Sequence, residues 1–303
     1  IMDKIKKKNV IENVEITIEV NPGTATRGKL EDYKNSGINR LSIGLQTANN
    51  KLLKQIGRIH NYEEFLETYM IAREVGFNNI NVDLMIDLPT QTLEDVKDSV
   101  KKIIGLEPEH ISVYSLILEE NTKMYELVKS KKLSLSEDDL ERRMYWYVKN
   151  TLEKNKYYQY EISNFAKKGF ESKHNLNCWN QKEYIGFGVA AHSYTNGIRY
   201  SNIENLEQYI KNYEEDKTEE NLVFHEKQDM EAMQKEYMLL GLRKIDGISI
   251  QEFKNKFVGN PLYIYRNELE KLVKEQLIEI ELDRIKLTEK GLDFANIVWE
   301  EFI

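Results

Sequence analysis

The stretch Asn79–Gly105 reads NINVDLMIDLPTQTLEDVKDSVKKIIG and decides the fold of this chain. Its first eight residues are rich in aliphatic side chains, which predicts a strand over 79–86 that is closed by the Asp-Leu-Pro turn at 87–89. A helix is predicted over 93–104, ended by Gly105. The stretch is therefore one strand–loop–helix unit, the building block of a parallel sheet.

The same alternation extends over the first 120 residues. Further strands are predicted over 14–20, 38–45 and 110–118. Strands that alternate with helices of roughly 10–15 residues predict parallel βαβ units with right-handed crossovers. Four such units are consistent with a doubly wound sheet or with a partial (β/α) barrel, and both folds bind ligands at the carboxyl ends of their strands. The predicted helices of this part are 27–36, 50–56, 62–75 and 93–104.

Beyond residue 120 the pattern changes twice. An amphipathic helix is predicted over 136–154, with Ser136 as its N-cap and acidic residues in its first turn. From about Phe224 the order becomes three helices and a short hairpin, which is the layout of a winged helix. We therefore expect three regions, namely a partial barrel over 1–120, a barrel-completing and linking region over 121–223, and a winged-helix-like domain over 224–303.

Composition and charge limit the class of protein. Hydrophobic residues make up 41% and charged residues 31% of the 303 residues, an ordinary globular composition. No apolar run approaches the roughly 20 residues of a membrane helix. The charged first eight residues lack the features of a signal peptide, so we expect a cytoplasmic protein. The net charge is −8, and residues 225–303 hold 12 basic against 16 acidic side chains, which argues against a nucleic-acid partner.

Cysteine usage limits the metal chemistry. Cys178 is the single cysteine of the sequence. It excludes an intrachain disulfide and any metal site built only from the cysteines of these residues. A [4Fe–4S] cluster needs three or four thiolates, which these residues alone do not supply.

Four motifs along the first half resemble the oxygen-independent coproporphyrinogen oxidase family of radical S-adenosylmethionine (SAM) proteins. Each motif alone is weak, and the specificity comes from their order and spacing. The resemblance continues into the second half and covers nearly the whole chain, and it implies a partial (β/α) barrel of the radical SAM type. The motifs are Glu19–Gly23 (EVNPG), Gly37–Gln46 (GINRLSIGLQ), Gly57–Asn61 (GRIHN) and Asn81–Thr92 (NVDLMIDLPTQT).

Three further motifs resemble the haem-chaperone branch of that family. One of them matches the branch signature His-Asn-x-x-Tyr-Trp, with Cys178 in the tyrosine position. This resemblance implies that the chain binds haem and delivers it to haem-accepting proteins, among them respiratory enzymes and other membrane-associated acceptors. The motifs are Tyr160–Ala166 (YEISNFA), His174–Asn180 (HNLNCWN) and Tyr184–Tyr194 (YIGFGVAAHSY).

A SAM site needs a cation for the carboxylate, acceptors for the ammonium and ribose hydroxyl groups, and apolar walls for the adenine. The resemblance implies that Glu19, Gln46, Arg58 and Asp83 make the polar contacts. Arg58 can bind a carboxylate through two N–H groups, Asp83 can accept from a ribose hydroxyl, and Glu19 can accept from the ammonium. A single acidic residue at a strand end more commonly caps a helix or orders a loop. A SAM site is favoured because all four residues fall at the positions that the family motifs give them.

For haem, His174 is the candidate axial ligand and Cys178, four residues later, is the thiolate alternative. If this segment is helical, both side chains lie on one helix face. Trp179 and Tyr184 are then candidates for stacking on the macrocycle. The alternative is that His174 and Asn175 only order a loop at the barrel mouth. His110 has the setting of a structural residue.

The sequence departs from the family at its beginning. Family members carry a Cys-x-x-x-Cys-x-x-Cys loop after the first strand and a Gly-rich segment after the second, and neither occurs here. We therefore expect a barrel without the first two of its six βα units, whose exposed edge at 14–20 promotes self-association as a homodimer. Because the [4Fe–4S] ligands are missing, we expect no SAM cleavage by this polypeptide.

Two other functions compete with haem delivery. A coproporphyrinogen oxidase would decarboxylate two propionates of its substrate, and the His-Asn-x-x-Cys-Trp segment argues against it. A regulator that binds DNA through the winged-helix-like domain is disfavoured by the acidic charge of that domain.

Overall fold

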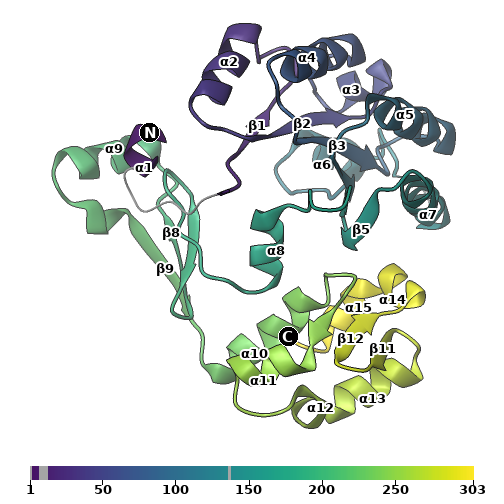
Figure 1. The fold of residues 1–303 in the computed structure, drawn as a ribbon, viewed down its shortest axis with the longest axis vertical. Coiled ribbons are helices and arrows are strands. Elements are labelled where there is room, and N and C mark those ends of the chain that lie inside the picture. The colour runs from purple at the N-terminus through teal and green to yellow at the C-terminus, as the bar shows by residue number, and fades with distance from the viewer. Residues whose placement is uncertain (1, 7–12, 136–137) are drawn as a thin grey trace. The chain divides into compact units, whose positions relative to one another are not determined.

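The computed structural model describes residues 2–6, 13–135 and 138–303 (Figure 1). The chain divides into two compact units, residues 1–171 and 172–303, and each is described by itself.

The first unit is built on a six-stranded mixed sheet with the strand order β1-β2-β3-β4-β6-β5. Strands β1 to β4 are parallel, as the sequence predicts, and β6 and β5 add to β4 in antiparallel orientation. The four predicted strands are confirmed, although β1 and β4 are shorter than expected. The strands are β1 Thr17–Val20, β2 Arg40–Gln46, β3 Ile80–Ile86, β4 His110–Ser115, β5 Tyr158–Glu161 and β6 Asn164–Ala166.

The predicted helices of the first unit correspond to α2, α3, α4, α5 and α7, which Figure 1 shows along one side of the sheet, whereas α6 was not predicted. Helices α4 and α5 both begin with a capping box, in which Asn61 pairs with Glu64 and Thr92 with Asp95. The predicted cap Ser136 lies outside the described residues. The helices are α1 Met2–Lys6, α2 Arg27–Asn35, α3 Asn50–Gln55, α4 Tyr62–Glu74, α5 Leu93–Leu106, α6 Lys123–Lys129 and α7 Asp138–Lys154.

The two faces of this sheet differ sharply in polarity, because successive strand residues point to opposite faces. On the helix-covered face, the aliphatic residues of β2, β3 and β4 are fully buried and pack against α4, α5 and α7. The opposite face carries polar residues instead: Glu19 on β1, Ser42 on β2, Asn81 and Asp83 on β3, and His110 and Ser112 on β4. The alternation in the sequence thus builds a dry core on one side and a polar surface on the other.

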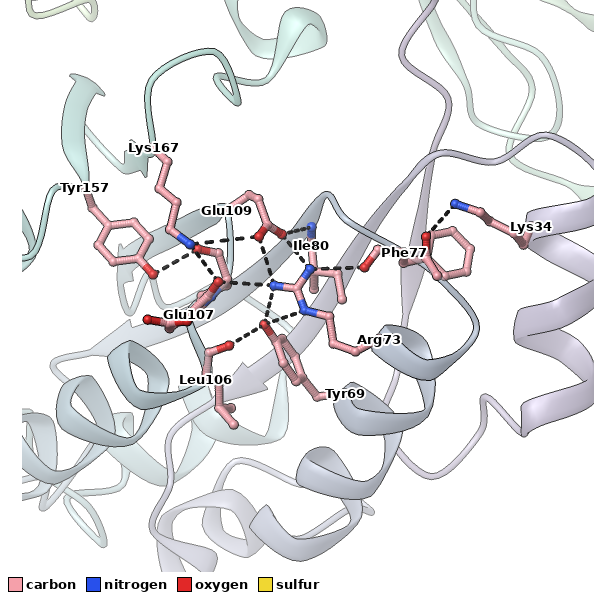
Figure 2. A network of polar contacts seen from close by, with 12 residues as sticks. Lys34, Tyr69, Arg73, Phe77, Ile80, Leu106, Glu107, Glu109, Tyr157 and Lys167 are labelled. Atoms are coloured by element: carbon pink, nitrogen blue, oxygen red, sulfur yellow. Dashed lines mark hydrogen bonds and ion pairs between the residues drawn. The ribbon is translucent and has the colours of Figure 1, made fainter.

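Side chains at the amino ends of β3 and β4 form a network of hydrogen bonds and ion pairs (Figure 2). Arg73 of α4 holds Glu109 through two N–H groups, at 2.8 and 3.0 Å, and also donates to the Tyr69 hydroxyl at 2.6 Å. Glu109 accepts the backbone N–H of Ile80 at 3.0 Å, and Lys167, just after β6, donates to the carbonyl of Glu107. The network thus connects α4 to the amino ends of β3 and β4 and to the residue that follows β6.

The second unit begins with helix α8 and a three-stranded antiparallel sheet of order β7-β8-β9. Its C-terminal part holds the predicted helices and hairpin, with β10 added to the hairpin as a third strand. The first group is α8 Lys173–Trp179, β7 His192–Thr195, β8 Ile198–Asn202, α9 Leu206–Glu214, the 3-10 helix Thr218–Asn221 and β9 Leu222–Lys227. The second group is α10 Met230–Gly241, β10 Ile248–Ser249, α11 Ile250–Lys256, α12 Pro261–Ile264, α13 Arg266–Lys274, β11 Ile278–Glu281, β12 Arg284–Leu287, α14 Glu289–Asp293 and α15 Ala295–Glu300.

A membrane-spanning helix is not found in the described part of the chain, since no helix there has both the length and the apolar run that spanning requires.

Candidate functional site

The carboxyl end of β2 forms the centre of a polar site. The strand is irregular between Gly44 and Gln46, and Gln46 takes a left-handed backbone conformation with φ of 71°. A Cβ atom on Gly44 would lie 2.8 Å from Nε2 of Gln46 and 4.0 Å from Nη1 of Arg58. The amide and the guanidinium therefore both lie over the same glycine, and a side chain at this position would displace the glutamine.

Arg58 is fixed from the neighbouring strand. Its Nη1 donates to Oδ1 of Asn21 at 3.1 Å, and Asn21 directly follows β1 and opens the turn that contains Gly23, with φ of 77°. Nη2 of Arg58 has no hydrogen bond to any described residue. This half-buried guanidinium thus has an anchored orientation and N–H groups left for an anion.

Asp83 lies on β3 beside this site, since its Cα is in register with that of Gly44. Its carboxylate accepts from Nδ2 of Asn81 at 2.7 Å and from Oγ of Ser42 at 3.3 Å. Burial raises the pKa of Asp83, the nearby carboxylate of Glu19 raises it further, and the hydrogen bonds from Asn81, Ser112 and Ser42 oppose that rise. The protein therefore keeps a desolvated carboxylate at the sheet surface with a second carboxylate close to it.

The structure thus gathers the four residues that the sequence predicts for SAM. Gln46 and Arg58 meet over Gly44, and the carboxylate of Glu19 lies close enough to Asp83 to add to the rise that burial causes in the pKa of Asp83. One cation, one amide and two carboxylates on or beside three neighbouring strands suit a zwitterionic ligand that also carries hydroxyl groups. Their roles in SAM binding stay a prediction.

Several residues of this site were not predicted from the sequence. Asn21 anchors Arg58, while Ser42, Asn81 and Ser112 hold Asp83. Their signal in the sequence is a polar side chain at every second position of otherwise aliphatic strands. That pattern gives the face on which a residue lies but not its partner on the next strand.

The predicted haem segment is helical, as helix α8, so His174 and Cys178, four residues apart, lie on one helix face. Ser172 caps α8 by accepting the N–H of Asn175, and Nε2 of His174 lies 3.8 Å from Sγ of Cys178. His174 is exposed and Cys178 is half-buried. Burial raises the pKa of the Cys178 thiol, and the Arg199 guanidinium opposes that rise. The imidazole is therefore the more available donor.

Trp179 and Tyr184, the aromatic residues proposed to stack on haem, contact other side chains of the second unit. The guanidinium of Arg243 lies 4.4 Å from the ring centre of Trp179 and 4.7 Å from that of Trp299 on α15. Tyr184 packs against Tyr194, with 6.5 Å between ring centres. Trp179 therefore joins α8 to the C-terminal helices, and part of its ring is already covered.

Comparison with known proteins identifies the class. Residues 1–103 match the model of the radical SAM superfamily, and residues 229–294 match that of the HemN C-terminal domain. The structure of coproporphyrinogen III oxidase (HemN) from Escherichia coli superposes with a TM-score of 0.83, at 20% identity, over 99% of this chain and 72% of that chain. The fold is therefore that of a radical SAM protein of the HemN type.

The particular family follows from two relatives named "Heme chaperone HemW". The relative from Lactococcus lactis is 38% identical over 95% of this chain and 75% of its own length, and that from Bacillus subtilis is 38% identical over 95% and 76%. The chain belongs to the HemW haem chaperone family. This result favours haem delivery over the coproporphyrinogen oxidase and DNA-binding alternatives.

Proposed function

We propose that this chain binds SAM at the carboxyl ends of β1, β2 and β3 and binds haem at α8, as a haem chaperone that supplies haem to acceptor proteins. The observation that carries this proposal is membership of the HemW family at 38% identity over three quarters of two relatives' lengths. The polar cluster around Gly44 supports the first half of the proposal, and the His174–Cys178 pair supports the second.

In the SAM site, each residue matches one group of the ligand. Arg58 binds the carboxylate of the methionine moiety, Glu19 accepts from its ammonium group, and Asp83 accepts from a ribose hydroxyl. Gln46 supplies an amide between them. The donors and acceptors present therefore fit the ligand, and SAM when bound contributes a sulfonium centre that these side chains orient.

The fit does not extend to an iron–sulfur cluster. These 303 residues contain one cysteine, and a [4Fe–4S] cluster needs at least three thiolates. We therefore assign no radical step to these residues and propose SAM binding without cleavage. Anaerobic incubation with iron, sulfide, reductant and SAM is expected to yield no 5′-deoxyadenosine, and turnover would contradict this part of the proposal.

SAM binding is tested by equilibrium dialysis with labelled SAM. Arg58→Ala is expected to weaken binding at least about tenfold, because a charge-assisted contact to the carboxylate is lost. Arg27→Ala is the matched control, since Arg27 pairs with Glu74 on the exposed surface of α2 and α4. Equal binding by both variants would contradict the site.

Haem binding is tested by titration at the Soret band. If His174 is the axial ligand, His174→Ala lowers the haem stoichiometry while Cys178→Ser leaves it unchanged. A thiolate-type spectrum lost in Cys178→Ser would instead assign the cysteine. His225→Ala, a change of another exposed imidazole of the second unit, is the control.

The acceptors we propose are haem-dependent proteins, including respiratory and membrane-associated enzymes, and the location we propose is the cytoplasm. We also propose that the chain forms a homodimer. Strand β1 supports this idea, because it is an edge strand whose pairing within the described sheet is with β2 alone. Sedimentation at increasing concentration tests it, and a monomer at every concentration would contradict it.

A further inference from the structure

A buried chain of hydrogen bonds leads away from Asp83 across the polar face of the sheet. Asn81 bonds Asp83 at 2.7 Å, His110 lies 2.6 Å from Asn81, and Tyr160 lies 2.8 Å from His110. Asn81 and His110 are at most 2% exposed. The four side chains come from β3, β4 and β5, so the chain spans much of the sheet.

The donors and acceptors of this chain are fixed by Asn81. Its Nδ2 donates to Asp83 and, at 2.8 Å, to Oγ of Ser42. Its Oδ1 faces Oγ of Ser112 at 3.1 Å and Nδ1 of His110 at 2.6 Å. An amide oxygen can only accept, so Nδ1 of His110 carries the proton. Nε2 of His110 then accepts from the hydroxyl of Tyr160.

The imidazole in the middle of the chain is neutral. Complete burial holds the pKa of His110 well below its ordinary value, and the positive charge of Arg40 acts in the same direction. A neutral imidazole has two possible tautomers, and the amide oxygen of Asn81 selects the one with the proton on Nδ1, because the hydroxyl of Tyr160 can either donate or accept. Every link is therefore a donor matched to an acceptor.

We propose that Tyr160, His110 and Asn81 are positioning residues that fix the orientation of the Asp83 carboxylate toward its ligand. This inference rests on the proposed function, in which that ligand is the ribose of SAM. If Tyr160 loses its hydroxyl, the buried Nε2 of His110 loses its hydrogen-bond partner, and the ring is no longer held from that side. The hydrogen bond from His110 to Asn81 then weakens, and Asn81 holds Asp83 less firmly through its 2.7 Å donor.

Other charged or titratable groups face this region and have to be held constant in a test. Glu19 on β1 raises the pKa of Asp83, and Arg40 on β2 lowers that of His110. Burial raises the pKa of the Tyr114 hydroxyl on β4, and the carboxylates of Asp83 and of Glu161 on β5 act in the same direction. A suitable variant therefore changes the chain at its far end and leaves these groups in place.

Tyr160→Phe is that variant, because it removes one hydroxyl and keeps the ring. In the protein without ligand, ¹⁵N NMR of His110 is expected to show the lost hydrogen bond at Nε2, and ¹³C NMR of the Asp83 carboxyl is expected to show a raised pKa, because the hydrogen bond from Asn81 to the charged form has weakened. Tyr158→Phe is the matched control, since Tyr158 lies on the same strand with its side chain exposed. Unchanged His110 and Asp83 signals in Tyr160→Phe would overturn the relay.

SAM affinity separates this inference from the proposed function. Tyr160→Phe is expected to bind SAM about two- to tenfold more weakly than the unchanged protein and than Tyr158→Phe. If the unchanged protein binds no SAM while the Asp83 pKa still responds to Tyr160→Phe, the relay exists and the proposed ligand is wrong. If SAM binds with equal affinity to all three proteins, the ligand stands and the positioning role is overturned.

Discussion

Two polar networks begin one residue apart at the start of β4, and they are built in opposite ways. Glu109 joins Arg73, whose guanidinium neutralises it through two hydrogen bonds and also holds the hydroxyl of Tyr69. His110 leads through Asn81 to Asp83, and none of the hydrogen bonds that Asp83 makes with the described residues comes from a lysine or an arginine.

The difference separates stability from binding. The network at the amino ends of the strands satisfies its charges internally, so it has no need of a ligand and contributes to folding. The network on the polar face ends in a carboxylate whose pKa burial has raised, and we expect its complement to come from a bound molecule. The amino ends of these strands and the polar face of the same sheet thus serve different purposes.

Removing the cation of the first network is expected to give the largest effect. Arg73→Ala leaves the partly buried Glu109 with only the more distant ammonium of Lys167, 3.9 Å away, and is expected to cost about 3 kcal/mol of unfolding free energy. Urea unfolding measures this loss. Arg27→Ala, which breaks an exposed ion pair, is expected to cost less than about 1 kcal/mol. Similar losses in the two variants would refute the stabilising role of the Arg73 network.

The second network is expected to show the reverse pattern. Asp83→Asn removes the charge and keeps an oxygen that accepts from Asn81, so unfolding free energy is expected to change by no more than about 1 kcal/mol. SAM binding is expected to weaken about thirtyfold, since a hydrogen bond to a charged group contributes about 2 kcal/mol. Dialysis and urea unfolding of the same sample give both numbers. A large loss of stability with intact binding would reverse our assignment.

The network on the polar face is also expected to respond to acid. The pKa of His110 is held well below 6.5 in the folded protein, so below pH 6.5 the unfolded chain binds a proton that the folded one does not. Its contribution to stability is therefore present above pH 6.5 and is lost as the pH falls, by about 1.4 kcal/mol per pH unit. Urea unfolding between pH 7 and pH 5.5 tests this, with His110→Gln as the comparison. An equal slope in both proteins would show that His110 does not titrate as inferred.

The smallest effect is expected from the glycine beneath the site. In Gly44→Ala the new Cβ lies 2.8 Å from Nε2 of Gln46, so the amide has to move. We expect SAM binding to weaken about fivefold, or about 1 kcal/mol. Gly28→Ala is the control, because a Cβ there meets nothing within 4 Å. Binding that is unchanged in Gly44→Ala would place Gln46 outside the site.

The parallel strands and their helices could be predicted because their signals are local. Alternation within β3 and the capping box at Thr92 and Asp95 both lie in one short stretch. The four residues proposed for SAM could be selected from the sequence because each falls in a motif, and their role stays a prediction. What the sequence did not predict are contacts between distant residues. His110 meets Tyr160 only because β6 and β5 add to β4, and nothing near either residue indicates that pairing.

The sheet β7-β8-β9 was missed for a different reason. Its first strand follows a segment rich in glycine. All six residues of β9 are exposed, so β9 lacks the alternation of apolar and polar residues by which a half-buried strand is predicted. The stacking of Trp179 on Arg243 was also not predicted, because a tryptophan close to a candidate axial ligand suggests that its ring stacks on haem. The structure gives it a partner within the protein instead.

That partner gives the protein an optical consequence. Two of its three tryptophans, Trp179 and Trp299, contact the same guanidinium, and one of them ends the short helix that carries His174. The fluorescence of these tryptophans therefore reports whether α8 is packed against the C-terminal helices. Haem bound near His174 would also quench that emission, so the protein carries its own reporter of loading and release.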